Sequence, residues 1–112
     1  MEREAKKLLH DILESCDYIK KFVGNLTFKD YVLNVLVKNG VERRFEIIGE
    51  ALNRLHKSHP NIAAQITDFR NIIDFRNVLT HGYDVVSDRL VWQIIQENLP
   101  LLKSEVVALF DD

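Results

Sequence analysis

Apolar residues recur every three or four positions along almost the whole chain, and no strand-length stretch shows them alternating with polar residues. This spacing gives each segment one apolar stripe along an α-helix, whereas a half-buried strand would require a period of two. The connections between the periodic segments are short, which favours antiparallel neighbours. With 112 residues, 46% of them hydrophobic, the chain can bury one core. We therefore expect an all-α antiparallel bundle of four to five helices, formed as a single domain over residues 1–112.

The N-terminal half divides at recognisable helix caps and breakers. A first helix is expected over about residues 2–22, ended by Gly24. Thr27 with Asp30 three residues later resembles a capping box and predicts the start of a second helix. Asn39-Gly40 is predicted to end that helix, so that a third begins near Val41.

The third helix carries more apolar residues than one stripe requires: Val41, Phe45, Ile47, Ile48, Leu52 and Leu55. It is expected to end near His59-Pro60. A surplus apolar face favours either a homodimer seam or a central helix packed on both sides, and periodicity alone does not choose between them.

Two more helices are expected in the C-terminal half. The fourth runs from about Asn61 to Gly82, which supplies the stop. Ser87 is predicted to cap the last helix. Pro100 is predicted to kink that helix, because proline lacks a backbone N–H and crowds the preceding turn.

Charge and cysteine content exclude some classes of protein. A formal net charge of −2 argues against binding nucleic acid through a broadly basic surface, so contact with RNA requires a local arginine patch or a subunit interface. The lone cysteine, Cys16, leaves no internal disulfide framework, and it lies on an apolar stripe, which favours a buried thiol over a nucleophile. Without a bilayer-spanning run or an apolar signal segment, we expect a cytoplasmic protein with no membrane partner.

The octapeptide Arg76-Asn77-Val78-Leu79-Thr80-His81-Gly82-Tyr83 carries the most suggestive chemistry. The planar fork of arginine fits phosphate oxygens, and histidine both takes and gives a proton near neutral pH. RNA carries its own nucleophile, the 2′-hydroxyl, so cleavage needs only proton transfer and a cation to stabilise the anionic phosphorane. We assign His81 to proton transfer, Arg76 to phosphate stabilisation and Asn77 to orienting the histidine or binding phosphate. No metal or other cofactor is expected.

Helix geometry constrains how these residues meet. Five residues correspond to about 140° around a regular helix, so one face cannot present both Arg76 and His81. Either the helix ends at His81 and frees the imidazole, or two subunits share the site. Plain structural roles are also open: Arg76 as an ion-pair partner of Asp74 or Asp84, and His81 as a helix-end residue.

The order of Arg76, a polar residue and His81 resembles the signature of HEPN-domain ribonucleases. His81-Gly82-Tyr83 extends it to the Arg-x4-His-x-Tyr form of the HepT-like toxins. Residues 41–51 and 91–102 are also similar to that family, so the resemblance covers nearly the whole chain.

The resemblance implies a helical homodimer in which two motifs meet in a cleft and cleave RNA without a metal. It implies the toxin of a type II or VII-like toxin–antitoxin pair, whose partner is an MntA-type minimal nucleotidyltransferase antitoxin. It also implies that this antitoxin can attach AMP to Tyr83. Such a group would add bulk and negative charge beside Arg76, where substrate phosphate must sit.

Three further arginines, Arg43, Arg44 and Arg70, are candidate substrate contacts, although a solvated charge network with nearby glutamates explains the first two equally well. His56 and His59 have a spacing that a metal can use, but exposed helix-end histidines are the simpler interpretation. The acidic net charge keeps a second function open, a non-catalytic helical module that pairs with a nucleotidyltransferase.

Overall fold

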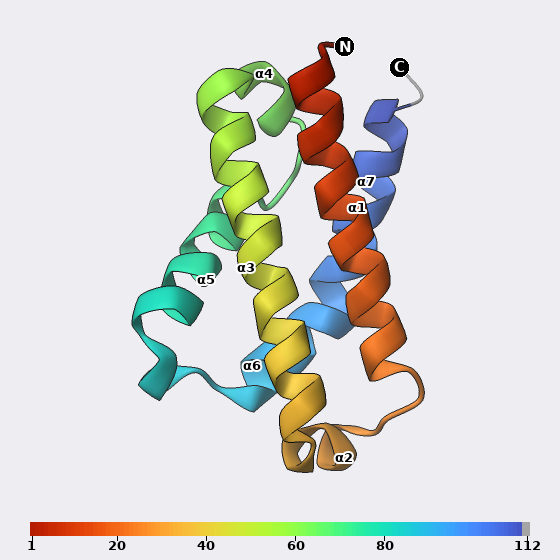
Figure 1. The fold of residues 1–112 in the computed structure, drawn as a ribbon, viewed down its shortest axis with the longest axis vertical. Helices are drawn as coiled ribbons and strands as arrows, with labels where there is room; N and C mark the ends of the chain where they lie inside the picture. The colour runs from red at the N-terminus through yellow and green to blue at the C-terminus, as the bar shows by residue number, and fades with distance from the viewer. Residues whose placement is uncertain (111–112) are drawn as a thin grey trace.

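The computed structural model describes residues 1–110, apart from the side chain of Tyr83, and this part of the chain contains helices and connecting segments but no strand (Figure 1). The elements are α1 (Arg3–Val23), α2 (Phe28–Leu33), α3 (Val35–Ser58), α4 (Pro60–Ala63), α5 (Phe69–His81), the 3-10 helix η1 (Tyr83–Val85), α6 (Asp88–Gln93), the π-helical turn η2 (Ile94–Asn98) and α7 (Leu99–Phe110). The long helices run antiparallel to their neighbours along the molecule, which confirms the all-α antiparallel bundle. The described residues form more helices than the four to five expected, because several of them are short. Over residues 1–110, no helix is both long and apolar enough to span a bilayer.

Helix α3 is the centre of the bundle. It packs against α1 on one side and α5 on the other, while α7 packs behind α1 (Figure 1). Its apolar side chains Val41, Ile48, Leu52 and Leu55 are fully buried, and Phe45 nearly so. The sixth apolar residue of this segment, Ile47, is only half-buried. Burial of the other five supports the second of the two expectations, a central helix covered on both sides.

The predicted break at Asn39-Gly40 is wrong, because the chain breaks earlier, at Asn34. The Asn34 side chain accepts a hydrogen bond from the Val37 N–H at 3.0 Å and so caps α3, which then continues through Gly40. A Cβ at Gly40 would lie 3.1 Å from the Phe22 ring, so this glycine permits close packing against α1 instead of ending a helix. The capping box at Thr27 and the stop at Gly24 are confirmed.

The predicted fourth helix is also interrupted, over residues 64–68, which leaves α4 and α5 as separate helices. The Thr67 N–H and hydroxyl donate to the Glu105 carboxylate on α7, at 3.1 and 2.7 Å. Ile66, next to it, is buried. These contacts hold the segment away from a continuous helix, and they come from a residue too distant in the chain for local periodicity to reveal. The stop at Gly82 is confirmed, and its N–H donates to the Val78 carbonyl at 2.7 Å.

In the last helical stretch, the Ser87 cap is confirmed, with its hydroxyl accepting from the Leu90 N–H at 3.3 Å. The sequence predicts a kink at Pro100, and the structure has the π-helical turn η2 directly before α7, which contains Pro100. Because Pro100 has no N–H to donate back along the helix and crowds the preceding turn, it favours a departure from regular α-helix at this place.

Candidate functional site

The motif arginine lies in a groove formed by α3, α5 and the edge of α1. We call it the arginine groove, because Arg43, Arg54 and Arg76 line it; its volume is about 460 Å³. Asp11, Glu46 and Glu50 line it as well, so cationic and acidic side chains are equal in number. The groove is thus a polar site of mixed charge, in which Arg43 and Arg76 each lie within 4.0 Å of a glutamate, and it is not an open basic patch.

Arg76 is held by two side chains. Its Nη2 donates to Glu50 Oε2 at 2.7 Å and its Nη1 donates to Asn77 Oδ1 at 3.0 Å. A guanidinium has five N–H donors, so three of them bond to no described residue and can face a bound anion. The Arg76 side chain is 26% exposed, which leaves those donors within reach of a ligand in the groove.

Two expectations about these residues change. The ion-pair partner of Arg76 is Glu50 on α3, so the alternative of Asp74 or Asp84 is wrong. Asn77 contacts Arg76, and no hydrogen bond joins it to His81 in the described part of the chain.

Gly49 explains how α5 comes so near α3. A Cβ at this position would lie 2.2 Å from Arg76 Cβ and 2.6 Å from Arg76 Cγ, distances that real Cβ atoms do not show. Only glycine therefore lets the Arg76 stem cross α3 at this point. Sequence reasoning did not single out Gly49, although a glycine inside an apolar helical pattern is a signal of close backbone approach.

His81 is the last residue of α5 and is exposed. Because the helix continues through His81, the separation of about 140° from Arg76 persists. In the described structure no hydrogen bond links the two side chains within one chain. Thr80, one residue earlier, donates its hydroxyl to the Arg76 carbonyl at 3.0 Å and lines the groove.

The structure separates the three other candidate arginines. Arg43 lines the arginine groove with Arg76; it is 68% exposed and lies 3.9 Å from the Glu46 carboxylate. Arg44 instead turns towards α1, where its guanidinium lies 4.1 Å from the centre of the Tyr18 ring. Arg70 is exposed and stacks over the ring of its neighbour Phe69 at 5.1 Å. Neither Arg44 nor Arg70 lines the groove, so the structure brings only Arg43 together with Arg76.

The described part of the chain does not bring His56 or His59 into the groove. The Tyr83 side chain lies outside the described residues. His59 bonds to Glu2 at 2.6 Å and His56 stacks on Phe69 at 5.1 Å between ring centres, so the two have different surroundings. Among the described residues, no three His, Cys, Asp or Glu side chains are grouped as for a metal ion.

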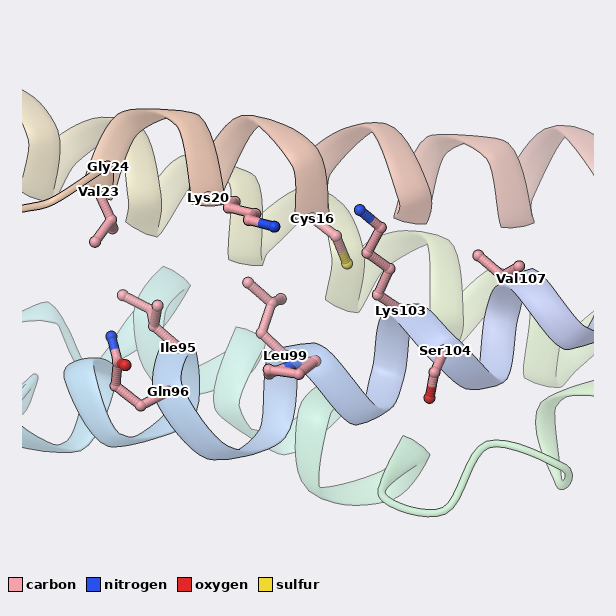
Figure 2. A pocket seen from close by; sticks show the side chains of 11 residues that line it. Cys16, Lys20, Val23, Gly24, Ile95, Gln96, Leu99, Lys103, Ser104 and Val107 are labelled. Atoms are coloured by element: carbon pink, nitrogen blue, oxygen red, sulfur yellow. The ribbon is translucent and has the colours of Figure 1, made fainter.

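A second cleft, of about 590 Å³, lies between α1 and the η2–α7 stretch and contains no motif residue (Figure 2). Its lining is mainly apolar, with Cys16 at the α1 wall and Lys103 on α7. The Cys16 thiol is 1% exposed, and burial raises its pKa to about 12. The prediction of a buried, unreactive cysteine is therefore confirmed by its surroundings.

Comparison with known proteins gives a consistent result. The family model described as Ribonuclease HepT-like matches residues 12–109. A protein of Methanocaldococcus jannaschii described as a candidate RNase, MJ1380, is 31% identical over 109 residues, which cover 94% of this chain and 95% of the relative. A protein of Thermococcus cleftensis named "Probable ribonuclease HepT" is 30% identical over 105 residues, 94% of each chain. No solved structure gives a significant match.

Proposed function

Because the chain belongs to the ribonuclease HepT-like family, we propose that it is a metal-independent RNA endonuclease. The 2′-hydroxyl of the substrate attacks the adjacent phosphorus, and the bond to the 5′-oxygen of the next nucleotide breaks. His81 moves the protons, a role worth typically ~10²–10⁴ in rate. Arg76 stabilises the charge that develops on the phosphoryl oxygens, worth roughly 2.7–4 kcal/mol for one well-placed donor. The observation that carries the proposal is that Glu50 and Asn77 hold Arg76 in a groove while three of its N–H donors bond to no described residue.

In this proposal the active site pairs Arg76 of one copy with His81 of a second copy. Support comes from the regular α5 helix, which keeps these two side chains of one chain on different faces. Val78 and Val85 are 40% and 71% exposed, and both lie next to Gly82, close to His81. An exposed apolar pair beside a catalytic histidine suits a face that a second subunit covers.

The substrate backbone runs along the arginine groove, where Arg43 and Arg54 add phosphate contacts to that of Arg76. With a net charge of −2, affinity depends on this local set of arginines. Asn77 acts through Arg76, since its side-chain oxygen accepts from the guanidinium.

The chain acts as the toxin of a toxin–antitoxin pair, and an MntA-type nucleotidyltransferase silences it by attaching AMP to Tyr83. The support is the sequence: Tyr83 is two residues beyond His81, directly after the stop of α5. An adenylyl group there brings a negative phosphodiester and considerable bulk to the motif, and both oppose the approach of RNA.

The nuclease test compares purified wild type with Arg76→Ala and His81→Ala on RNA in buffer that contains a chelator. Both variants should lose cleavage. His10→Ala removes another exposed histidine, on α1, and Arg70→Ala removes an arginine of α5 outside the groove. Both controls should cleave like wild type, and intact RNA with wild-type protein would refute the proposal.

The modification test measures the intact mass after co-expression with the nucleotidyltransferase. Wild type and Tyr18→Phe should gain adenylate, and Tyr83→Phe should not. Tyr18 is the matched control because it is 38% exposed, whereas Tyr31 is fully buried. Adenylate that remains on Tyr83→Phe would contradict the assignment.

One observation favours a second function, a non-catalytic module that binds a nucleotidyltransferase. The acidic side chains of the arginine groove match its arginines in number, which weakens attraction for RNA. Under this alternative, wild type leaves RNA intact but still co-purifies with the nucleotidyltransferase.

A further inference from the structure

The Arg76 guanidinium is fixed from α3 by a single short contact, the one to Glu50. Its 2.7 Å length is typical of a charge-assisted hydrogen bond. Neighbouring pairs in the same region are looser: Arg43 lies 3.9 Å from Glu46 and Arg44 lies 4.0 Å from Glu14. Asp11 also forms a short bond, at 2.8 Å, but its partner is Lys7, which does not line the groove. Among the acidic residues of the groove, Glu50 is therefore the one with a short bond to a groove arginine.

We propose that Glu50 is a positioning residue, which holds the Arg76 guanidinium at a fixed place and orientation for phosphate in the arginine groove. The inference rests on the proposed ribonuclease function and assigns a role within that site. Glu50 does not contact the reacting atoms in this scheme; it acts through Arg76.

Three contacts act on Arg76 together. Gly49, adjacent to Glu50 on α3, lets the Arg76 stem lie directly on the helix, as the 2.2 Å distance from its ideal Cβ shows. Glu50 then bonds Nη2, and Asn77 bonds Nη1. An arginine side chain has many rotamers, and fixing the stem and both terminal nitrogens removes most of them before substrate arrives.

Positioning also leaves the cation available. Glu50 is 49% exposed, so water screens its charge, and it occupies one of the five donors. Within the described part of the chain, the Nε–H and one N–H on each terminal nitrogen have no partner, which leaves enough donors for a bidentate contact with phosphate oxygens.

The test compares Glu50→Ala, Glu50→Gln and Glu46→Gln. Glu46 lies one turn earlier on α3 and lines the same groove, so its variant removes the same charge without touching Arg76. Glu50→Ala should lower kcat by roughly 10- to 100-fold relative to Glu46→Gln, as expected for a misplaced catalytic group. KM should differ little between Glu50→Ala and Glu46→Gln, because both variants remove one negative charge from the groove. Glu50→Gln keeps an oxygen acceptor for Nη2 and should recover part of kcat.

A second readout does not require activity. In protein labelled with nitrogen-15, the Arg76 side-chain signals, identified by their loss in Arg76→Lys, should show restricted rotation in wild type and Glu46→Gln. In Glu50→Ala the guanidinium should rotate freely, so that the separate Arg76 N–H signals merge into averaged ones. If wild type leaves RNA intact but these signals respond as expected, the ribonuclease proposal fails and the positioning role stands. If Glu50→Ala cleaves as fast as Glu46→Gln or faster, or if the Arg76 signals do not change, the positioning role is overturned.

Discussion

Substitution of Gly49 by alanine puts the packing of Arg76 to a direct test. The new Cβ would lie 2.2 Å from Arg76 Cβ, whereas ordinary contact begins at 3.4 Å, so α3 and α5 must separate locally by about 1.2 Å. Rotation of the arginine cannot relieve the clash, because the backbone of α5 fixes the Cβ atom.

The magnitude follows from two opposing terms. Overpacking of a close contact costs typically 1–3 kcal/mol. Replacing glycine by alanine inside a helix returns about 0.8–1 kcal/mol. The difference is a net loss of about 0–2 kcal/mol in the free energy of unfolding. The 2.2 Å approach favours the upper end, ~2 kcal/mol, which corresponds to a fall in Tm of roughly 8 °C for a chain of this size. A displacement of about 1 Å at a catalytic group should also reduce RNA cleavage about 10²-fold.

Gly40→Ala is the matched control, since both glycines lie inside α3. Its Cβ would meet the Phe22 ring at 3.1 Å, and that ring can turn aside because it is the end of a side chain. Thermal unfolding should show a Tm unchanged or raised for Gly40→Ala and lowered for Gly49→Ala. Equal Tm and equal cleavage for the two variants would refute the packing argument.

Three other outcomes are expected. Burial and the nearby Asp88 carboxylate raise the pKa of Glu42 above its usual 4.5, so ionisation of this side chain destabilises the fold. Glu42→Gln should therefore raise Tm at pH 7, and the gain in Tm should vanish near pH 4, where Glu42 is protonated. A gain in Tm that does not depend on pH would contradict the assignment. The pKa of Cys16 is raised to about 12, so iodoacetamide at pH 8 should leave this thiol unmodified in the folded protein and modify it once urea unfolds the chain. Intact mass measures the modification, and rapid labelling of the folded protein would refute the burial of Cys16. Asn34→Ala removes the side-chain cap of α3, so urea titration should show a free energy of unfolding about 1 kcal/mol lower. An unchanged urea midpoint would show that this cap does not stabilise the fold.

Local patterns predicted the parts of the fold that depend on near neighbours in the chain. The capping box at Thr27, the cap at Ser87 and the stops at Gly24 and Gly82 each involve residues within a turn of one another. Their energetics are local, so their signals are local as well.

The predictions of helix ends that were wrong depend on contacts between residues far apart in the chain. Glu105 holds Thr67 out of a helix from 38 positions away, and packing against Phe22 allows Gly40 to lie inside a helix. A glycine in a single sequence can therefore be read in two ways, because glycine either ends a helix or lets a second helix pack closely against it.

The candidate site shows the same division. The motif residues Arg76 and His81 were recognisable by their residue types and order in the sequence. Helix geometry predicted that one helix presents them on different faces. The partner Glu50 lies 26 positions before Arg76, and only the packing of α5 on α3 identifies it. Arg44 and Arg70 were equally good candidates by residue type, and contacts with Tyr18 and Phe69 place them elsewhere.

The central claim is that Arg76 of one copy works with His81 of another, and mixing two inactive variants tests it directly. Arg76→Ala and His81→Ala, each inactive alone, are combined in equal amounts under conditions that let subunits exchange, and RNA cleavage is measured. Half of the resulting dimers carry both variants and each contains one intact pairing, so activity should return to about a quarter of the wild-type value. Cleavage no greater than that of either variant alone would contradict a site shared between subunits.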